Sequence, residues 1–253
     1  MIAITRDVSP AVERAELTHM DRVSIDYHRA AEQHEQYRAL LRSLGCEVID
    51  LPADPNHPDC VFIEDTAVVL DDVAVITRPG AESRRGEVEV VANELARHRP
   101  LVRIEAPATL DGGDVLVLGD RIYAGLSSRT NEAAVEQLAR LTGREVTGVR
   151  VAGALHLKTA ITRVSDDTLL VNREWVDVAP FAGWKLIDVD PEEPFAGNAV
   201  FLRDKLVYPA AFARTRARLE AHGLDVRTID ADELAKAEGG VTCCSLLLNL
   251  ARQ

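Results

Sequence analysis

The sequence predicts an α/β protein built from five repeated strand–strand–helix–strand units that close into a ring. The first observation is an internal repeat, because polar residues recur at intervals of 42 to 46 positions. The second is that each of them opens the same local order of apolar strand, turn, strand, helix and strand. An ordinary α+β domain with accidental spacing would not explain this shared order. The repeated positions are Asp65, Asp111, His156, Asn198 and Cys243.

The N-terminal region supplies a strand at residues 2–6 and a long helical pattern at residues 26–44. Gly45 ends this helix, because glycine readily adopts the left-handed conformation that follows a helix C-terminus. A strand at residues 46–51 comes next. The polar, proline-containing stretch at residues 52–59 is then expected to be a connecting loop.

Four complete units follow, and each is predicted to contain three strands and one helix. The first two units contain strands 66–70, 73–77 and 101–105 with helix 87–98, and strands 115–118, 122–124 and 145–151 with helix 132–141. The next two contain strands 158–164, 169–171 and 184–189 with helix 173–181, and strands 198–202, 206–208 and 225–229 with helix 211–222.

The fifth unit begins at Cys243, and the sequence ends before the rest of that unit. The N-terminal strand and helix supply the missing elements, so the two ends of the chain are expected to share one unit. Closure of this kind removes the exposed edges of an open repeat. We expect a single catalytic domain spanning residues 1–253.

Composition narrows the functional class. The 253 residues are 47% hydrophobic and 28% charged, which suits a globular chain with a sizeable core. The net charge of -12 would repel phosphate backbones, so we expect no nucleic-acid partner. We also expect no membrane partner and a cytoplasmic location, because no apolar run suits a leader or a membrane span. The four cysteines form no CxxC pair, which indicates a reducing compartment.

Equivalent positions of a closed repeat converge on one axis, so Cys243, His156 and Asp111 are expected to share a cavity. A thiol, an imidazole and a carboxylate together form the nucleophile, base and orienting acid of covalent catalysis. Each residue also has a structural interpretation. Cys243 could be a buried small apolar residue, His156 a core histidine, and Asp111 part of a tight turn.

A second group of charges indicates the ligand. Asp59, Glu64 and Asp65 place three carboxylates within seven positions, and burying them requires a cation such as a guanidinium. Arg84 and Arg129 follow the second strand of successive units and suit the carboxylate of an amino acid. Together these groups describe an arginine-like ligand, although Asp59 could instead cap a turn and Arg84 could form a solvated pair with Arg85.

Six segments carry a resemblance to a known family: DCVFIEDTAVV, ITRPGAESRRGE, ATLDGGDVL, GLSSRTNEAA, LHLKTA and GGVTCCSLLL. From about residue 15 to its end, the chain resembles dimethylarginine dimethylaminohydrolase, one of the guanidino-modifying enzymes with a five-bladed β/α propeller (pentein) fold.

The resemblance implies that Cys243 attacks the guanidino carbon, that His156 protonates the leaving amine and activates water, and that Asp111 orients His156. It implies a small-molecule substrate, citrulline and dimethylamine or methylamine as products, no metal or organic cofactor, and a monomer or homodimer. The implied substrate-binding positions are the side chains of Asp59, Phe62, Glu64, Asp65, Arg84 and Arg129 and the backbone of Leu17 and Ala237.

Other functions of this superfamily fit less well. Arginine deiminases carry a His-x-Asp pair, whereas His156 is followed by Leu157 and Lys158. Agmatine deiminases have a histidine before the catalytic cysteine, where this chain has Thr242. A non-catalytic propeller that binds a protein, and inhibitory zinc binding by the two thiols and His156, remain as alternatives. Residues 17–24 form a polar loop that suits a lid over the cavity.

Overall fold

Strands of the protein form five separate three-stranded sheets in a computed structural model that describes residues 1–249. In each sheet the central strand is antiparallel to one neighbour and parallel to the other. Four sheets are each formed by consecutive strands: β3–β5 (Ala67–Val69, Ala74–Ile76, Leu101–Arg103), β6–β8 (Val115–Leu118, Arg121–Leu126, Val146–Arg150), β9–β11 (Ile161–Arg163, Thr168–Val171, Lys185–Asp188) and β12–β14 (Val200–Leu202, Lys205–Pro209, Asp225–Ile229).

The fifth sheet joins the two ends of the described chain. β1 (Ile2–Arg6) lies between β15 (Leu246–Leu248), to which it is antiparallel, and β2 (Glu47–Leu51), to which it is parallel. Ile2 is opposite Leu248 in this register. The sequence predicts this sharing of one sheet between the two ends.

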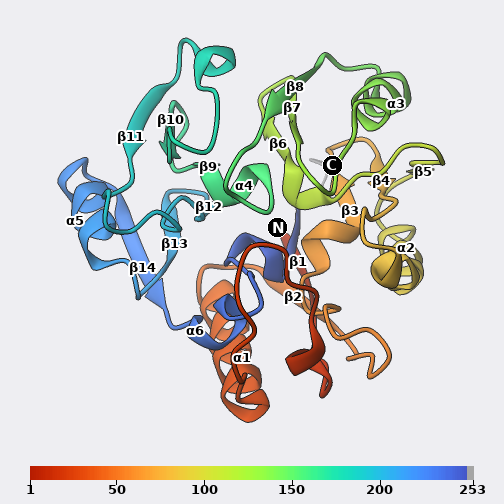
Figure 1. The fold of residues 1–253 in the computed structure, drawn as a ribbon, viewed down its shortest axis with the longest axis horizontal. Helices are drawn as coiled ribbons and strands as arrows, with labels where there is room; N and C mark the ends of the chain where they lie inside the picture. The colour runs from red at the N-terminus through yellow and green to blue at the C-terminus, as the bar shows by residue number, and fades with distance from the viewer. Residues whose placement is uncertain (250–253) are drawn as a thin grey trace.

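The α-helices longer than a single turn each connect the central strand of a sheet to its parallel neighbour and lie on the outside of the molecule, while the sheets surround a common centre (Figure 1). The mixed α/β class is therefore confirmed. Within residues 1–249, none of the helices is both long and apolar enough to cross a bilayer. The α-helices are α1 (Tyr27–Ser43), α2 (Val88–Leu95), α3 (Glu132–Thr142), α5 (Ala213–Ala221) and the single turns α4 (Leu157–Ala160) and α6 (Asp232–Ala235).

The limits of these helices follow from local chemistry. The Asp26 carboxylate accepts hydrogen bonds from the backbone N–H groups of His28 and Arg29, which starts α1. Gly143 ends α3 in the left-handed conformation, at a φ of 65°. The predicted stop of α1 at Gly45 also agrees with the structure, since Gly45 has a φ of 84°.

The predicted helix at residues 173–181 is wrong. Only a 3₁₀ turn, Ala179–Phe181, forms there. Val176 instead makes an antiparallel bridge with Val151, and the carbonyl of Trp175 accepts a hydrogen bond from the Ala152 N–H. Pairing with the neighbouring unit thus holds the segment extended, which overrides its helical periodicity.

The apolar core is divided into five clusters, and each lies between neighbouring sheets. One cluster joins Val68 of β3, Val115 of β6 and Leu138 of α3, all buried. This packing leaves the edges of the sheets that face the common centre free to carry polar side chains.

A short helical turn precedes the first strand of four sheets, where the sequence predicted strands or tight turns. These turns contact one another near the centre of the molecule. Because they come from different units, they bring distant segments of the chain together. They are the 3₁₀ turns Ile63–Thr66, Gly112–Asp114 and Thr242–Cys244, and the helix α4.

Candidate active site

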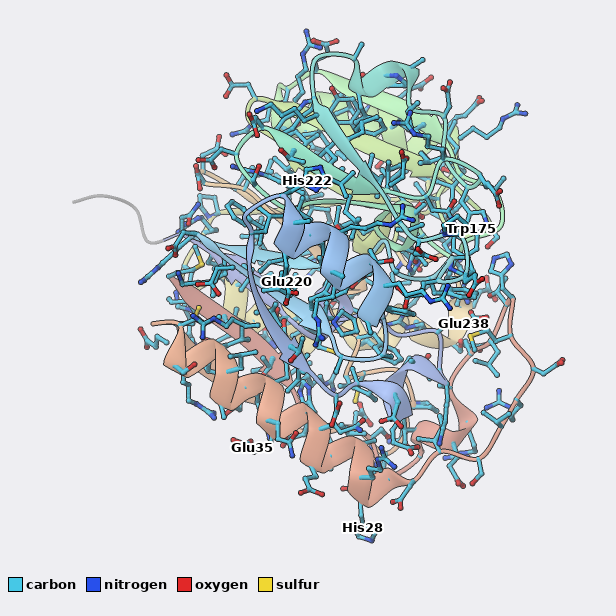
Figure 2. All side chains as sticks on the ribbon, turned by 90° about the vertical axis from the view of Figure 1, so that its left-hand side faces the viewer. His28, Glu35, Trp175, Glu220, His222 and Glu238 are labelled. Carbon is cyan, nitrogen blue, oxygen red and sulfur yellow. The ribbon has the colours of Figure 1, made fainter. Side chains whose placement is uncertain are left out.

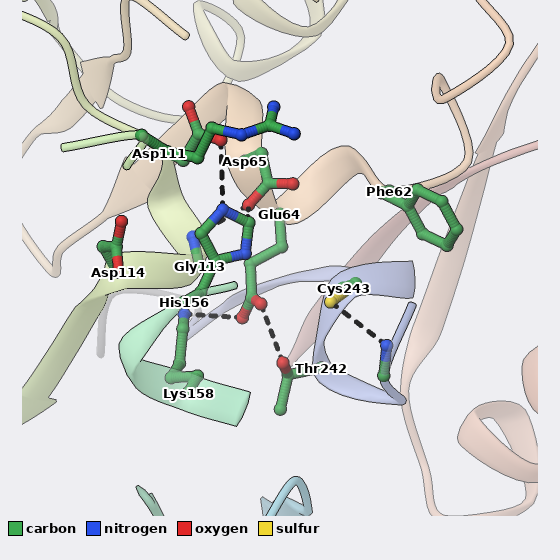
Figure 3. Close-up of polar contacts among 12 residues, drawn as sticks. Phe62, Glu64, Asp65, Asp111, Gly113, Asp114, His156, Lys158, Thr242 and Cys243 are labelled. Carbon is green, nitrogen blue, oxygen red and sulfur yellow. Dashed lines mark hydrogen bonds and ion pairs between the residues drawn. The ribbon is translucent and has the colours of Figure 1, made fainter. Parts of the chain in front are cut away.

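The thiol of Cys243 lies in the last of these turns and accepts a hydrogen bond from the Gly240 N–H at 3.3 Å (Figure 3). Asn198 holds the turn from the neighbouring unit. Its side-chain oxygen accepts a hydrogen bond from the Thr242 N–H at 3.0 Å, and its amide nitrogen donates to the Thr242 hydroxyl at 2.9 Å. These contacts give Asn198 a structural role at the turn that carries Cys243.

Gly239 packs against the ring of Phe62, which is 3% exposed. A Cβ atom at residue 239 would lie 2.2 Å from that ring, so only glycine fits without rearrangement. Close packing against Phe62 is therefore the reason for a glycine at this position.

His156 and Asp111 form the pair that the sequence predicted. His156 Nε2 lies 3.0 Å from Asp111 Oδ2, and Asp111 Oδ1 accepts a hydrogen bond from the Gly80 N–H at 2.9 Å. The other ring nitrogen, Nδ1, lies 3.8 Å from Asp65 Oδ1 (Figure 3). Glycine at residue 113 allows Asp65 and His156 to lie this close, since a Cβ atom there would be 2.7 Å from Asp65 Oδ1 and 2.7 Å from His156 Nδ1.

Buried charges determine how His156 and Asp65 titrate. Burial alone would lower the pKa of His156, but the Asp65 carboxylate and the hydrogen bond to Asp111 raise it to about 9. Burial alone would raise the pKa of Asp65, but the charges of His156 and Arg84 lower it to about 2. The histidine is therefore an imidazolium near neutral pH and can act as an acid.

Arg84 lies in the interior of the protein rather than in a solvated pair with Arg85. Its guanidinium donates to Asp65 Oδ2 at 2.6 Å, to the Glu87 carboxylate at 2.9 Å and to the carbonyl of Phe62 at 3.1 Å. It is 4% exposed. Arg84 is thus a cation, supplied by the chain itself, that neutralises Asp65.

Glu64 is neutralised in the same way. Its carboxylate accepts hydrogen bonds from Lys158 Nζ at 2.6 Å and from the Thr242 hydroxyl at 2.7 Å (Figure 3). It lines a separate cavity of about 280 Å³. Burial of these carboxylates was expected to require a cation, and for Glu64 and Asp65 the chain itself supplies one, through Lys158 and Arg84.

Asp59 is bound by a backbone N–H group, whereas Glu64 and Asp65 are bound by basic side chains. Its carboxylate accepts hydrogen bonds from the Glu16 N–H at 3.1 and 3.2 Å. Burial raises its pKa to about 6, although the charge of Arg84 opposes that rise. Arg129 is 8% exposed, and its Nη2 donates to the Thr18 hydroxyl at 3.0 Å.

Most of the predicted site residues line one small cavity of about 10 Å³. Asp111 lies behind His156, Glu64 faces the other cavity, and Leu17 is half-buried in the loop beside Glu16. The predicted residues that line the small cavity are Asp59, Phe62, Asp65, Arg84, Arg129, His156, Ala237 and Cys243.

A metal ion could receive ligand atoms from Asp65, Asp111 and His156, which lie within 4.8 Å of one another. Asp65 already accepts hydrogen bonds from Arg84 and from the Gly113 N–H. A cation at this position would therefore face the Arg84 guanidinium. We interpret the three side chains as a hydrogen-bonded imidazolium and its partners, and neither thiol belongs to this group.

The ligand-free thiol is expected to react slowly at neutral pH. Burial raises the pKa of Cys243 well above its ordinary value, and the carboxylates of Glu64 and Asp65 raise it further. Alkylation of Cys243 by iodoacetamide, followed by mass spectrometry, should therefore accelerate about tenfold per pH unit between roughly pH 7 and 9. A rate independent of pH in this range would contradict the raised pKa.

Comparisons with known proteins agree with this geometry. A family model described as N,N dimethylarginine dimethylhydrolase, eukaryotic, matches residues 14–248. The chain belongs to the dimethylarginine dimethylaminohydrolase family. It is 38% identical over 250 residues to the N(G),N(G)-dimethylarginine dimethylaminohydrolase of Streptomyces coelicolor, covering 97% of this chain and 96% of the relative.

The family relative from Pseudomonas aeruginosa is 38% identical over 226 residues, covering 87% of this chain and 89% of the relative. A solved structure of dimethylarginine dimethylaminohydrolase from that organism, a mutant complexed with citrulline, superimposes with a TM-score of 0.92 at 35% identity. The match covers 96% of this chain and 97% of the solved one.

Several contacts of this family member were missed by sequence reasoning. Lys158 and Glu87 neutralise buried groups, Thr242 bonds Glu64, and Asp114 accepts a hydrogen bond from the Leu157 N–H beside His156. Lys158 and Thr242 flank His156 and Cys243 in sequence, which is a signal that could have identified them. Glu87 carries no comparable signal, because its partner depends on how Arg84 folds inward.

Proposed function

We propose that this chain hydrolyses Nω-methylated arginine to citrulline and dimethylamine or methylamine, through a covalent intermediate on Cys243. One observation carries the proposal. A single cavity contains a thiol, an imidazolium and a buried carboxylate, in a chain that is 38% identical over most of its length to a named dimethylarginine dimethylaminohydrolase.

In the first step the Cys243 thiolate attacks the guanidino carbon and forms a C–S bond. The bond to the methylated nitrogen then breaks, its electron pair stays on that nitrogen, and His156 donates the proton. In the second step water attacks the same carbon and gives a proton to His156. The C–S bond breaks, its electron pair returns to sulfur, the remaining proton of the water passes to solvent, and citrulline is released.

The bound substrate itself promotes formation of the thiolate. Carboxylates near Cys243 oppose its ionisation, and a guanidinium placed beside Asp65 would offset their charge. The same contact holds the guanidino carbon in place for attack. Asp111 keeps His156 oriented throughout, since it receives the Nε2 hydrogen bond at 3.0 Å.

The amino-acid end of the substrate would be held on the opposite side of the cavity. We assign its carboxylate to Arg129 and Arg84, which both line the cavity. We assign the α-amino group to Asp59 and to the carbonyls of Leu17 and Ala237. Glu64 supports the guanidinium indirectly through Thr242 and the negative charge that it places near Cys243.

Incubation with asymmetric dimethylarginine is expected to release citrulline and dimethylamine in equal amounts, measured by a colorimetric assay and by chromatography. Monomethylarginine and free arginine serve as comparison substrates. No release of dimethylamine would contradict the proposal. Faster ammonia release from free arginine would instead identify an arginine deiminase-like hydrolase.

The arrangement of the five sheets supports a further structural proposal. We propose that they form the blades of a five-bladed β/α propeller, with β15 and β1 closing the fifth blade. The apolar clusters between neighbouring sheets support one catalytic domain, because each sheet shares its core with the next.

A further inference from the structure

Glu238, which lines the small cavity, makes three hydrogen bonds to a neighbouring loop. Its carboxylate accepts from the backbone N–H groups of three consecutive residues, Thr18 at 3.0 Å, His19 at 2.5 Å and Met20 at 2.7 Å. Hydrogen bonds from several N–H groups to one carboxylate are charge-assisted and stronger than neutral ones. Glu238 thus joins residues 17–24 to the segment that carries Cys243.

Arg22 and Ser24 hold the far end of this loop: the Arg22 guanidinium donates to the carbonyls of Glu13 and Ala15, and the Ser24 hydroxyl donates to the Glu13 carboxylate. Residues 18–24 are exposed, and Met20 is 37% exposed, so apolar burial contributes little. The loop projects from the body of the protein beside Glu238 (Figure 2). The Thr18 hydroxyl accepts one hydrogen bond from Arg129, and the Glu16 N–H donates to Asp59. Leu17 therefore lies in the chain between Glu16, which is bound by Asp59, and residues 18–20, which are bound by Glu238.

Local contacts of the main chain hold Glu238 in place. Its own N–H donates to the Ala235 carbonyl at 3.0 Å at the end of α6, and Gly239 packs against Phe62. Its φ of 59° lies in the left-handed region, which is unfavourable for a glutamate. The three hydrogen bonds that its side chain accepts from the loop offset the conformational cost of this backbone geometry.

The cavity must open for an amino acid to bind. Its volume of about 10 Å³ is room for about one water molecule. Glu238 lines this cavity and also the neighbouring cleft of about 610 Å³, which His19 and Met20 line as well. The loop that Glu238 holds therefore borders the larger cleft, and Glu238 itself borders both spaces.

We propose that Glu238 is a positioning residue that fastens residues 17–24 over the bound substrate and places the Leu17 carbonyl against its α-amino group. This role rests on the proposed hydrolysis of methylated arginine. Glu238 acts through the loop, so its removal should weaken substrate binding far more than it slows the chemical steps.

Hydrogen exchange of the ligand-free protein tests the fastening directly. In Glu238→Ala the amides of Thr18, His19 and Met20 should exchange at least about tenfold faster than in the wild type. Glu238→Gln keeps the length and one acceptor oxygen, so it should give a smaller increase. Glu220→Gln, an exposed site on α5 (Figure 2), is the matched control and should change nothing. Unchanged exchange in Glu238→Ala would overturn the proposal.

Steady-state kinetics with asymmetric dimethylarginine test the positioning role. We expect KM to rise about tenfold or more in Glu238→Ala and less in Glu238→Gln, with kcat lowered by no more than about threefold. An unchanged KM, or a loss confined to kcat, would overturn the role. The hydrogen-exchange experiment needs no substrate. If the wild type released no dimethylamine, the proposed hydrolysis would be refuted, but the exchange rates would still show whether Glu238 holds the loop.

Discussion

Replacing Cys243 with serine is expected to lower citrulline formation from asymmetric dimethylarginine by at least on the order of a thousandfold. The guanidinium is a poor electrophile, so the reaction needs a strong nucleophile. A serine hydroxyl is much less acidic than a thiol, and the same carboxylates that raise the pKa of the Cys243 thiol would suppress its ionisation further.

The adjacent thiol provides a matched control for this prediction. Cys244 is also buried, but its sulfur is directed towards the carbonyl of Gly240 at 3.6 Å. Cys244→Ser should therefore retain activity within about tenfold of the wild type. Thermal melting of both variants checks that they fold. Equal losses in the two folded variants, or full activity in Cys243→Ser, would contradict the assignment of the nucleophile.

Replacing His156 with glutamine is expected to lower kcat/KM by about a hundredfold to ten-thousandfold, the usual contribution of a positioned acid or base. The imidazolium is the group that protonates the leaving amine in the proposed reaction. Glutamine can preserve a hydrogen bond to Asp111, but it cannot transfer a proton. His222→Gln, an exposed position after α5 (Figure 2), should leave kcat/KM unchanged.

The pH dependence of kcat/KM distinguishes this role from a structural one. The resting site carries a thiol and an imidazolium, because the pKa of Cys243 is raised well above its ordinary value and that of His156 is raised to about 9. The reacting form has lost the thiol proton, so kcat/KM should rise with pH above about 7. Above about pH 9 the resting site has already lost the histidine proton, so the rise should level off.

In His156→Gln the value of kcat/KM should be lower, and its rise with pH should no longer level off near pH 9. A profile in which the variant levels off at the same pH as the wild type would assign the ionisation to another group. Profiles recorded above about pH 7 avoid interference from Asp59, whose pKa is raised to about 6 by burial.

The sequence by itself determined the repeated architecture and most of the residues at its centre. Apolar periodicity, turn residues and recurring polar positions are local signals, and they located the strands, most of the helices and the residues Asp65, Asp111, His156 and Cys243. The failure at residues 173–181 has a tertiary cause, since Val176 pairs with Val151 in a neighbouring unit.

Only the tertiary structure decided which charges meet. Arg84 folds inward onto Asp65 and Glu87, Lys158 neutralises Glu64, and Glu238 receives three amides of a loop more than 200 positions away. The sequence supplied these charges but not their partners. Ion pairs between distant segments depend on how neighbouring units pack, because burial makes each unpaired charge costly and so selects the partner that folding brings within reach.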